Sequence, residues 1–87
     1  IRIWDVDSGR TEAVLTGHGR GVLSLGFTPD GRQLISGTGT PLAREVKVAE
    51  LKQWDLGTRS VLRDLPSGGQ AVWDIAVSPD GARIATA

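Results

Sequence analysis

The sequence repeats itself at a spacing of 50 residues. The dipeptide Trp4-Asp5 recurs as Trp54-Asp55, and the tripeptide Pro29-Asp30-Gly31 recurs as Pro79-Asp80-Gly81. Further pairs keep the same offset: Leu15 with Leu65, Gly19 with Gly69, and Val22 with Val72. A single offset over most of the chain indicates a duplicated unit, and such a unit buries its apolar face only by stacking on its neighbours.

Each unit has the pattern of short β-strands separated by turns. Residues 1–6 alternate apolar and polar side chains at period 2, which is the spacing of a half-buried strand. The apolar run 22–27 leads into a Thr-Pro-Asp-Gly sequence, in which proline suits the second position of a type I turn and glycine the fourth. Further strands are predicted at 13–15, 34–36, 72–77 and 82–87. The chain is therefore predicted to be all-β.

The composition narrows the classes of partner. Ten Lys and Arg residues balance ten Asp and Glu residues, so the chain lacks the excess of positive charge that nucleic-acid binding requires. No apolar run approaches the roughly 18–20 residues of a membrane span, and no signal-peptide pattern is present. There is no cysteine, which excludes disulfides. We expect no nucleic-acid or membrane partner, and among compartments the cytoplasm is favoured.

Four short motifs resemble those of WD (WD40) repeats in type and in order. They are Gly17-His18, the turn at 28–31, Ser36-Gly37 and Trp54-Asp55. The resemblance covers nearly the whole chain, and it implies a β-propeller built from four-stranded antiparallel blades. In that family, strands a to d of a blade run from the central channel outward.

Mapped onto this chain, the resemblance implies half a blade, a whole blade and another half. Residues 1–16 correspond to strands c and d, residues 17–65 to a complete blade, and residues 66–87 to strands a and b of the next. Both ends look cut, and the strands there would have unpaired edges. We therefore expect that the 87 residues alone do not persist as a well-folded monomer. Further blades of the same chain, or self-association, would complete the ring.

The resemblance also implies a stabilising polar cluster of a loop His, a strand-b Ser or Thr, a strand-c Trp and an Asp of the b–c loop. His18, Ser36 and Trp54 fill three of these positions. Buried imidazole and indole N–H groups each need a hydrogen-bond partner, so these residue types occur together. In the last blade, Gly68 stands where the His is expected although Thr86 is kept, so the cluster is predicted to be lost there.

The b–c loop, assigned to residues 38–50, departs from the family pattern. Repeats of this type run roughly 40–45 residues, and the extra length falls in this loop, which contains no Asp. Glu45 and Glu50 are the two residues of this loop left as replacements for the missing Asp of the polar cluster. Strand c is either 45–48 or 51–54, and the second is preferred because it contains the Trp-Asp anchor. Gln53 then stands at the position that Ile3 occupies in the first unit, where an apolar residue is expected, and this should weaken the strand.

Catalytic and metal-binding interpretations lack the necessary residues. His18 is the only histidine, so a Ser-His-Asp triad would have to use it with Ser36, and the structural cluster is favoured. One histidine with scattered carboxylates does not indicate a metal site, and residues 37–39 lack the ending of a phosphate-binding loop. Asp30 and Asp80 are interpreted as turn residues. No enzymatic activity and no cofactor are predicted.

The predicted function is a scaffold that binds a protein or peptide, an inference that rests on the fold family. The candidate partner face consists of Arg20, Arg44, Lys47, Gln70 and Trp73. Trp and Arg dominate interface hot spots, and Trp73 is expected to begin a strand near the channel mouth. Packing of Trp73 between blades, and a merely solvated loop at 44–47, are the competing interpretations. A regulatory module of a larger kinase or nucleotidase, and an extracytoplasmic ligand-binding propeller, are alternative functions.

Overall fold

The computed structural model describes residues 1–39, 49–68 and 70–87, and within these ranges the regular structure consists of eight β-strands. In chain order they are β1 (Arg2–Trp4), β2 (Thr11–Val14), β3 (Val22–Phe27), β4 (Gln33–Thr38), β5 (Leu51–Asp55), β6 (Ser60–Leu65), β7 (Ile75–Val77) and β8 (Ile84–Thr86). No helix in these ranges is long and apolar enough to cross a membrane. The prediction of an all-β chain is confirmed.

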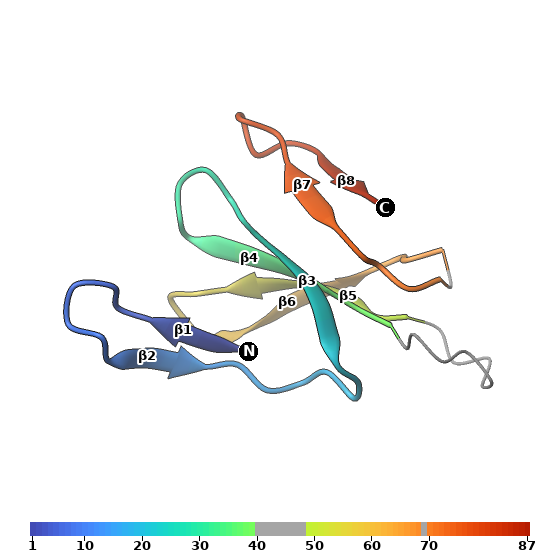
Figure 1. The fold of residues 1–87 in the computed structure, drawn as a ribbon. Helices are drawn as coiled ribbons and strands as arrows, with labels where there is room; N and C mark the ends of the chain where they lie inside the picture. The colour runs from blue at the N-terminus through green and yellow to red at the C-terminus, as the bar shows by residue number, and fades with distance from the viewer. Residues whose placement is uncertain (40–48, 69) are drawn as a thin grey trace.

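The strands form three antiparallel sheets (Figure 1). A four-stranded sheet of order β3-β4-β5-β6 lies between two hairpins, β1-β2 and β7-β8. Every neighbouring pair is antiparallel and consecutive in sequence. This arrangement confirms the predicted fold class, a propeller fragment with one complete four-stranded blade and a half-blade on each side. Short turns join β3 to β4 and β5 to β6, so local sequence signals suffice to specify these two pairings, whereas a longer loop separates β4 from β5.

The two hairpins pack on opposite faces of the four-stranded sheet. Consecutive residues of β4 point to opposite faces, as the pleat of a strand requires. Leu34 packs with Leu15 and Trp54 in a cluster that also contacts the apolar side chains of β1. Ile35 packs in a second cluster with Leu51, Val72 and Ile75, on the side of β7. The central strand β4 therefore contributes side chains to the packing against both hairpins.

Strand c is β5 (Leu51–Asp55), which confirms the preference for the segment that contains the Trp-Asp anchor. The alternative, 45–48, lies outside the described residues. In the register with β4, Trp54 lies opposite Leu34 and Gln53 opposite Ile35. Gln53 donates from Nε2 to Oε1 of Gln33 at 2.6 Å, so its amide has a polar partner at a position where an apolar residue is the norm.

The two Pro-Asp-Gly turns have the same hydrogen-bond pattern. The amide of Gly31 donates to the carbonyl of Thr28 at 2.9 Å, and Oδ1 of Asp30 accepts from Oγ1 of Thr28 at 2.6 Å. Ser78 and Asp80 repeat that side-chain bond at 2.6 Å. These hydroxyl donors are the main reason why the pKa of each aspartate lies below its ordinary value. Both carboxylates therefore have local partners within their own turns.

Three predicted strands are shorter than expected. The predicted strand 1–6 is reduced to β1 and 82–87 to β8. The predicted strand 72–77 is reduced to β7, so Trp73 lies before the strand and does not begin it. The reason is visible in the backbone hydrogen bonds. The amide of Val72 donates to the carbonyl of Thr38 in the four-stranded sheet at 3.0 Å, whereas the amide of Trp73 donates to Ala87 at 2.7 Å. The segment is shared between two sheets, which interrupts a regular ladder.

Candidate functional site

The structure brings His18, Ser36 and Trp54 together from three separate segments. His18 lies in the loop between β2 and β3, Ser36 in β4 and Trp54 in β5. Nε2 of His18 is 2.5 Å from Oγ of Ser36, and Nε1 of Trp54 donates to the same oxygen at 2.7 Å. The two rings meet edge to face, with centroids 5.9 Å apart. One serine hydroxyl therefore joins the loop histidine to the indole.

Glu50 supplies the carboxylate of this group. Its Oε2 lies 2.6 Å from Nδ1 of His18 and accepts a hydrogen bond from the amide of Gly19 at 3.2 Å. The sequence left Glu45 and Glu50 as equal replacements for the missing Asp, and Glu45 lies outside the described residues. Glu50 directly precedes β5, and the sequence contained no signal that selected it over Glu45. We call His18, Ser36, Glu50 and Trp54 the polar cluster.

One arrangement of protons satisfies every member of the polar cluster. The indole N–H of Trp54 can only donate, so Oγ of Ser36 accepts it. The hydroxyl proton of Ser36 is then free for Nε2 of His18. In this arrangement Nδ1 of His18 donates to the carboxylate of Glu50. The hydrogen bonds thus run in one direction, from Trp54 through Ser36 and His18 to the carboxylate.

Burial makes these hydrogen bonds necessary. Trp54 is 1% exposed and Ser36 is fully buried, whereas the side chain of Glu50 remains 33% exposed. A buried polar group without a partner costs free energy, and no such side-chain atom occurs in the described ranges. The hydrogen bond from His18 is the main cause that lowers the pKa of Glu50, and the amide of Gly19 adds to it. The polar cluster therefore extends from the buried indole of Trp54 to the partly solvated carboxylate of Glu50.

Backbone hydrogen bonds hold Glu50 in position. Its amide donates to Oγ1 of Thr38 at 2.8 Å, and its carbonyl accepts from the amide of Thr38 at 2.9 Å. Thr38 is the last residue of β4 and is fully buried. The pairing of β4 with β5 thus extends to the residue that faces His18. A rigid strand end, and not the loop alone, positions the carboxylate.

The order of groups from Glu50 through His18 to Ser36 is that of a hydrolytic triad, but the hydroxyl is in the wrong environment. A nucleophilic serine must reach a substrate carbonyl. Ser36 is fully buried, and its oxygen already accepts from Trp54. Among the described residues, no cluster of three or more His, Cys, Asp or Glu side chains could hold a metal ion. The buried hydroxyl of Ser36 therefore lacks the exposure that a nucleophile requires.

The candidate partner face is only partly described. Arg44 and Lys47 lie outside the described residues. Arg20 is half-buried in the loop that contains His18, and Gln70 is exposed. Trp73 is 57% exposed, so the described residues cover less than half of it. The structure thus leaves this indole accessible on the segment that leads into β7.

The last half-blade has no counterpart of the polar cluster among its described residues. Gly68 has a positive φ of 78° and no side chain to offer, and Thr86 is exposed on β8. The hydroxyl of Thr86 thus occupies the position of Ser36 without the histidine. The complete blade therefore has the polar cluster, and the described residues of the last half-blade do not form one.

The fold and the polar cluster together define a class of protein. A four-stranded antiparallel blade between two half-blades, with a histidine loop held to strands b and c through a serine and a tryptophan, is a WD-repeat β-propeller segment. The family described as "WD domain, G-beta repeat" matches residues 9–40 and 59–87, which is more than half of the chain. The chain therefore belongs to the WD40 family.

A curated relative agrees with this assignment. The chain is 34% identical over 85 residues to the Periodic tryptophan protein 2 homolog of Neurospora crassa. The match covers 98% of this chain but only 9% of that relative. The chain thus spans a small part of the length of the relative it matches.

Proposed function

We propose that this chain is part of a propeller scaffold that binds a protein or a peptide and catalyses no reaction. WD40 repeats generally serve as scaffolds for protein interactions. The observation that carries the proposal for this chain is the exposed indole of Trp73. The candidate partner face, with Arg20, Arg44, Lys47, Gln70 and Trp73, is retained as the binding surface.

Trp73 combines an exposed side chain with a constrained backbone. Its side chain is 57% exposed, while its amide donates a hydrogen bond to the carbonyl of Ala87. The preceding residue, Val72, is 2% exposed and bonded to Thr38. A tryptophan offers a large contact area with few rotatable bonds, and a fixed backbone reduces the entropy lost on binding. These properties support a role as an anchor for a partner.

We also propose that the blade limits are 1–16, 17–65 and 66–87. The three sheets support these limits, since no strand pairs across residues 16–17 or 65–66 in the described ranges. On this division Arg20 and Gln70 follow corresponding blade boundaries. Loops between blades lie on one face of a propeller, which places both residues on the same side as the candidate partner face.

Selection from a phage-displayed library of random peptides tests the proposal. Peptides selected on the wild-type chain should bind Trp73→Ala roughly 30-fold more weakly, which corresponds to a hot spot of about 2 kcal/mol. Leu62→Ala is the matched control, because Leu62 is an exposed apolar residue of β6 away from the face. Affinities that are equal for the wild type and Trp73→Ala would reject Trp73 as the anchor.

A further inference from the structure

The segment before β7 is bonded to the four-stranded sheet at one residue, Val72. Its amide donates to the carbonyl of Thr38 at 3.0 Å, and its carbonyl accepts from Oγ of Ser24 at 2.8 Å. Within the described residues, these two hydrogen bonds are the ones that join 70–87 to that sheet. Val72 is also buried. It is therefore the polar attachment point of the last half-blade.

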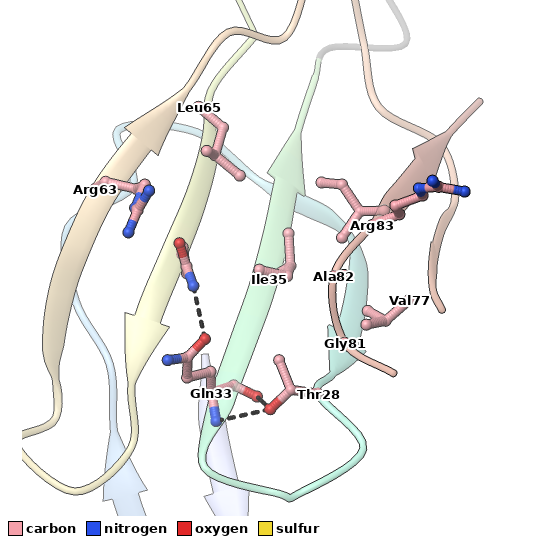
Figure 2. Close-up of a pocket in the computed structure, with 11 residues that line it drawn as sticks. Thr28, Gln33, Ile35, Arg63, Leu65, Val77, Gly81, Ala82 and Arg83 are labelled. Atoms are coloured by element: carbon pink, nitrogen blue, oxygen red, sulfur yellow. Dashed lines mark hydrogen bonds between the residues drawn. The ribbon is translucent and has the colours of Figure 1, made fainter. Parts of the chain in front are cut away.

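Side-chain packing in the same interface is close along β7 and looser beside β8. A Cβ at Gly26 of β3 would lie 3.2 Å from the side chains of Ile75 and Val77, so the backbone of β3 lies near β7. Beside β8, a pocket of about 280 Å³ lies between the sheet and the hairpin, with Arg63 on the side of the sheet and Arg83 on that of the hairpin (Figure 2). The segment that leads into β7 is thus on the closely packed side of the hairpin.

A glycine makes room for the contact between Ser24 and Val72. The register of β3 with β4 places Ser24 opposite Gly37. A Cβ at Gly37 would lie 2.7 Å from Oγ of Ser24 and from the side chain of Val72. Ser24 is 8% exposed, so its hydroxyl meets the carbonyl of Val72 in a site with little access to water. A short hydroxyl side chain at residue 24 therefore suits this site.

The carbonyl of Val72 belongs to the same peptide unit as the amide of Trp73. A trans peptide unit is planar, and its C=O and N–H point in opposite directions. Ser24 bonds to the carbonyl from the four-stranded sheet, while the amide of Trp73 donates to Ala87 of the hairpin at 2.7 Å. The next amide, that of Asp74, also donates to Ala87 at 3.2 Å. The peptide units on both sides of Trp73 are therefore fixed, and this fixes the direction in which its side chain leaves the backbone.

We propose that Ser24 is a positioning residue, whose hydroxyl sets the direction of the Trp73 indole through the peptide unit between Val72 and Trp73. Without this hydroxyl the carbonyl of Val72 would be buried with no partner, which costs free energy. Rotation of the peptide unit toward water would relieve that cost, and it would also turn the amide of Trp73 away from Ala87. The inference rests on the proposed function, because Trp73 is the proposed anchor for a partner.

The competing explanation is that Ser24 stabilises the hairpin as a whole. In that case its loss would release all amides of the hairpin alike, since a cooperative unit opens together. Loss of positioning would instead release the amide of Trp73 in preference to the others. Gly81 provides the reference, because its amide donates to the carbonyl of Ser78 at 2.9 Å in the turn at the far end of the same hairpin.

Amide hydrogen exchange at one fixed protein concentration separates the two explanations. Ser24→Ala should speed exchange at Trp73 by at least about fivefold more than exchange at Gly81, the factor that corresponds to one net hydrogen bond. Ser78→Ala is the matched control, because it removes a hydroxyl from the hairpin turn and leaves both partners of the Val72–Trp73 peptide unit in place. It should speed exchange at Gly81 at least as much as at Trp73. Equal acceleration at the two amides in Ser24→Ala would overturn the proposal.

Peptides selected on the wild-type chain test the consequence for binding. They should bind Ser24→Ala about fivefold more weakly, because the orientation of Trp73 that binds is then only a fraction of the ensemble. In a chain that already has Trp73→Ala, Ser24→Ala should cause no further loss, because the indole that it positions is absent. An equal loss with and without the indole would overturn the proposal. If Trp73→Ala binds as the wild type does, the proposed function fails, whereas preferential exchange at Trp73 would still support the positioning by Ser24.

Discussion

Oε2 of Glu50 lies 2.6 Å from Nδ1 of His18, although 32 residues separate them in the chain. This contact joins the loop before β3 to the residue that directly precedes β5. The carboxylate reaches the histidine from the start of strand c, and the backbone pairing of Glu50 with Thr38 keeps it there. A glutamate therefore contacts the histidine where the family resemblance implied an aspartate.

Removal of the Ser36 hydroxyl should destabilise the blade more than removal of an exposed one. Ser36→Ala leaves the indole N–H of Trp54 and the ring of His18 without their shared partner in a buried site. We expect a loss of about 2–4 kcal/mol in the free energy of unfolding, because each unsatisfied buried group costs about 1–3 kcal/mol. Urea denaturation at one fixed protein concentration measures it. Ser60→Ala, at an exposed position, is the control, and equal losses would contradict the prediction.

His18→Ala should cost about 1–3 kcal/mol of unfolding free energy, from the loss of its buried hydrogen bonds. Its effect should not add to that of Ser36→Ala, because both variants break the same hydrogen bond. The double variant should therefore be more stable than the two separate losses predict, by at least about 0.5 kcal/mol. Denaturation of the four proteins of this cycle gives the coupling. Strict additivity would show that the two side chains act independently.

Stability should fall in acid because of Glu50. The hydrogen bond from His18 holds the pKa of Glu50 below its ordinary value of 4.5, so the folded chain binds this proton less readily than the unfolded chain. The contribution is fully present above pH 4.5 and is lost as the pH falls through the lowered pKa. Glu50→Gln should flatten this part of the stability profile from pH 6 to 3, measured by thermal melting. An unchanged slope in Glu50→Gln would assign the acid sensitivity to other carboxylates.

Gly37→Ala should destabilise the packing of the second half-blade. A Cβ at residue 37 would lie 2.7 Å from Oγ of Ser24 and from the side chain of Val72. Both neighbours are buried, so relief requires movement of the segment before β7, and overpacking of this kind costs about 1–3 kcal/mol. Gly21→Ala is the control, since nothing lies within 4 Å of its added Cβ. Equal melting temperatures for the two variants would contradict the prediction.

The strands and their order were predictable because the signals are local. The apolar run 22–27 and the Pro-Asp-Gly turn mark β3 and β4, and the Trp-Asp anchor selected 51–54, which the structure extends to Leu51–Asp55 as β5. Strand ends were less predictable. Trp73 falls outside β7 because the amide of Val72 bonds to Thr38 of another sheet, and no pattern within 72–77 reveals that competition.

The polar cluster was predictable in three of its four members. His18, Ser36 and Trp54 stand at positions that the family resemblance marks, and the structure places them within one chain of hydrogen bonds. Their stabilising role stays a prediction, which the variants above test. Glu50 could not be chosen from the sequence because its side chain is directed by a pairing with Thr38 that depends on how β4 and β5 come together.

The amino-acid sequence by itself determined the repeat, the all-β architecture and the order of strands within the blade, because turns and alternation act between neighbours in the chain. Only the tertiary structure decided that Glu50 supplies the carboxylate, and that the amide of Val72 bonds to Thr38 of the four-stranded sheet. Both contacts join segments that are far apart in the chain, and a spacing in sequence does not specify the distance between them.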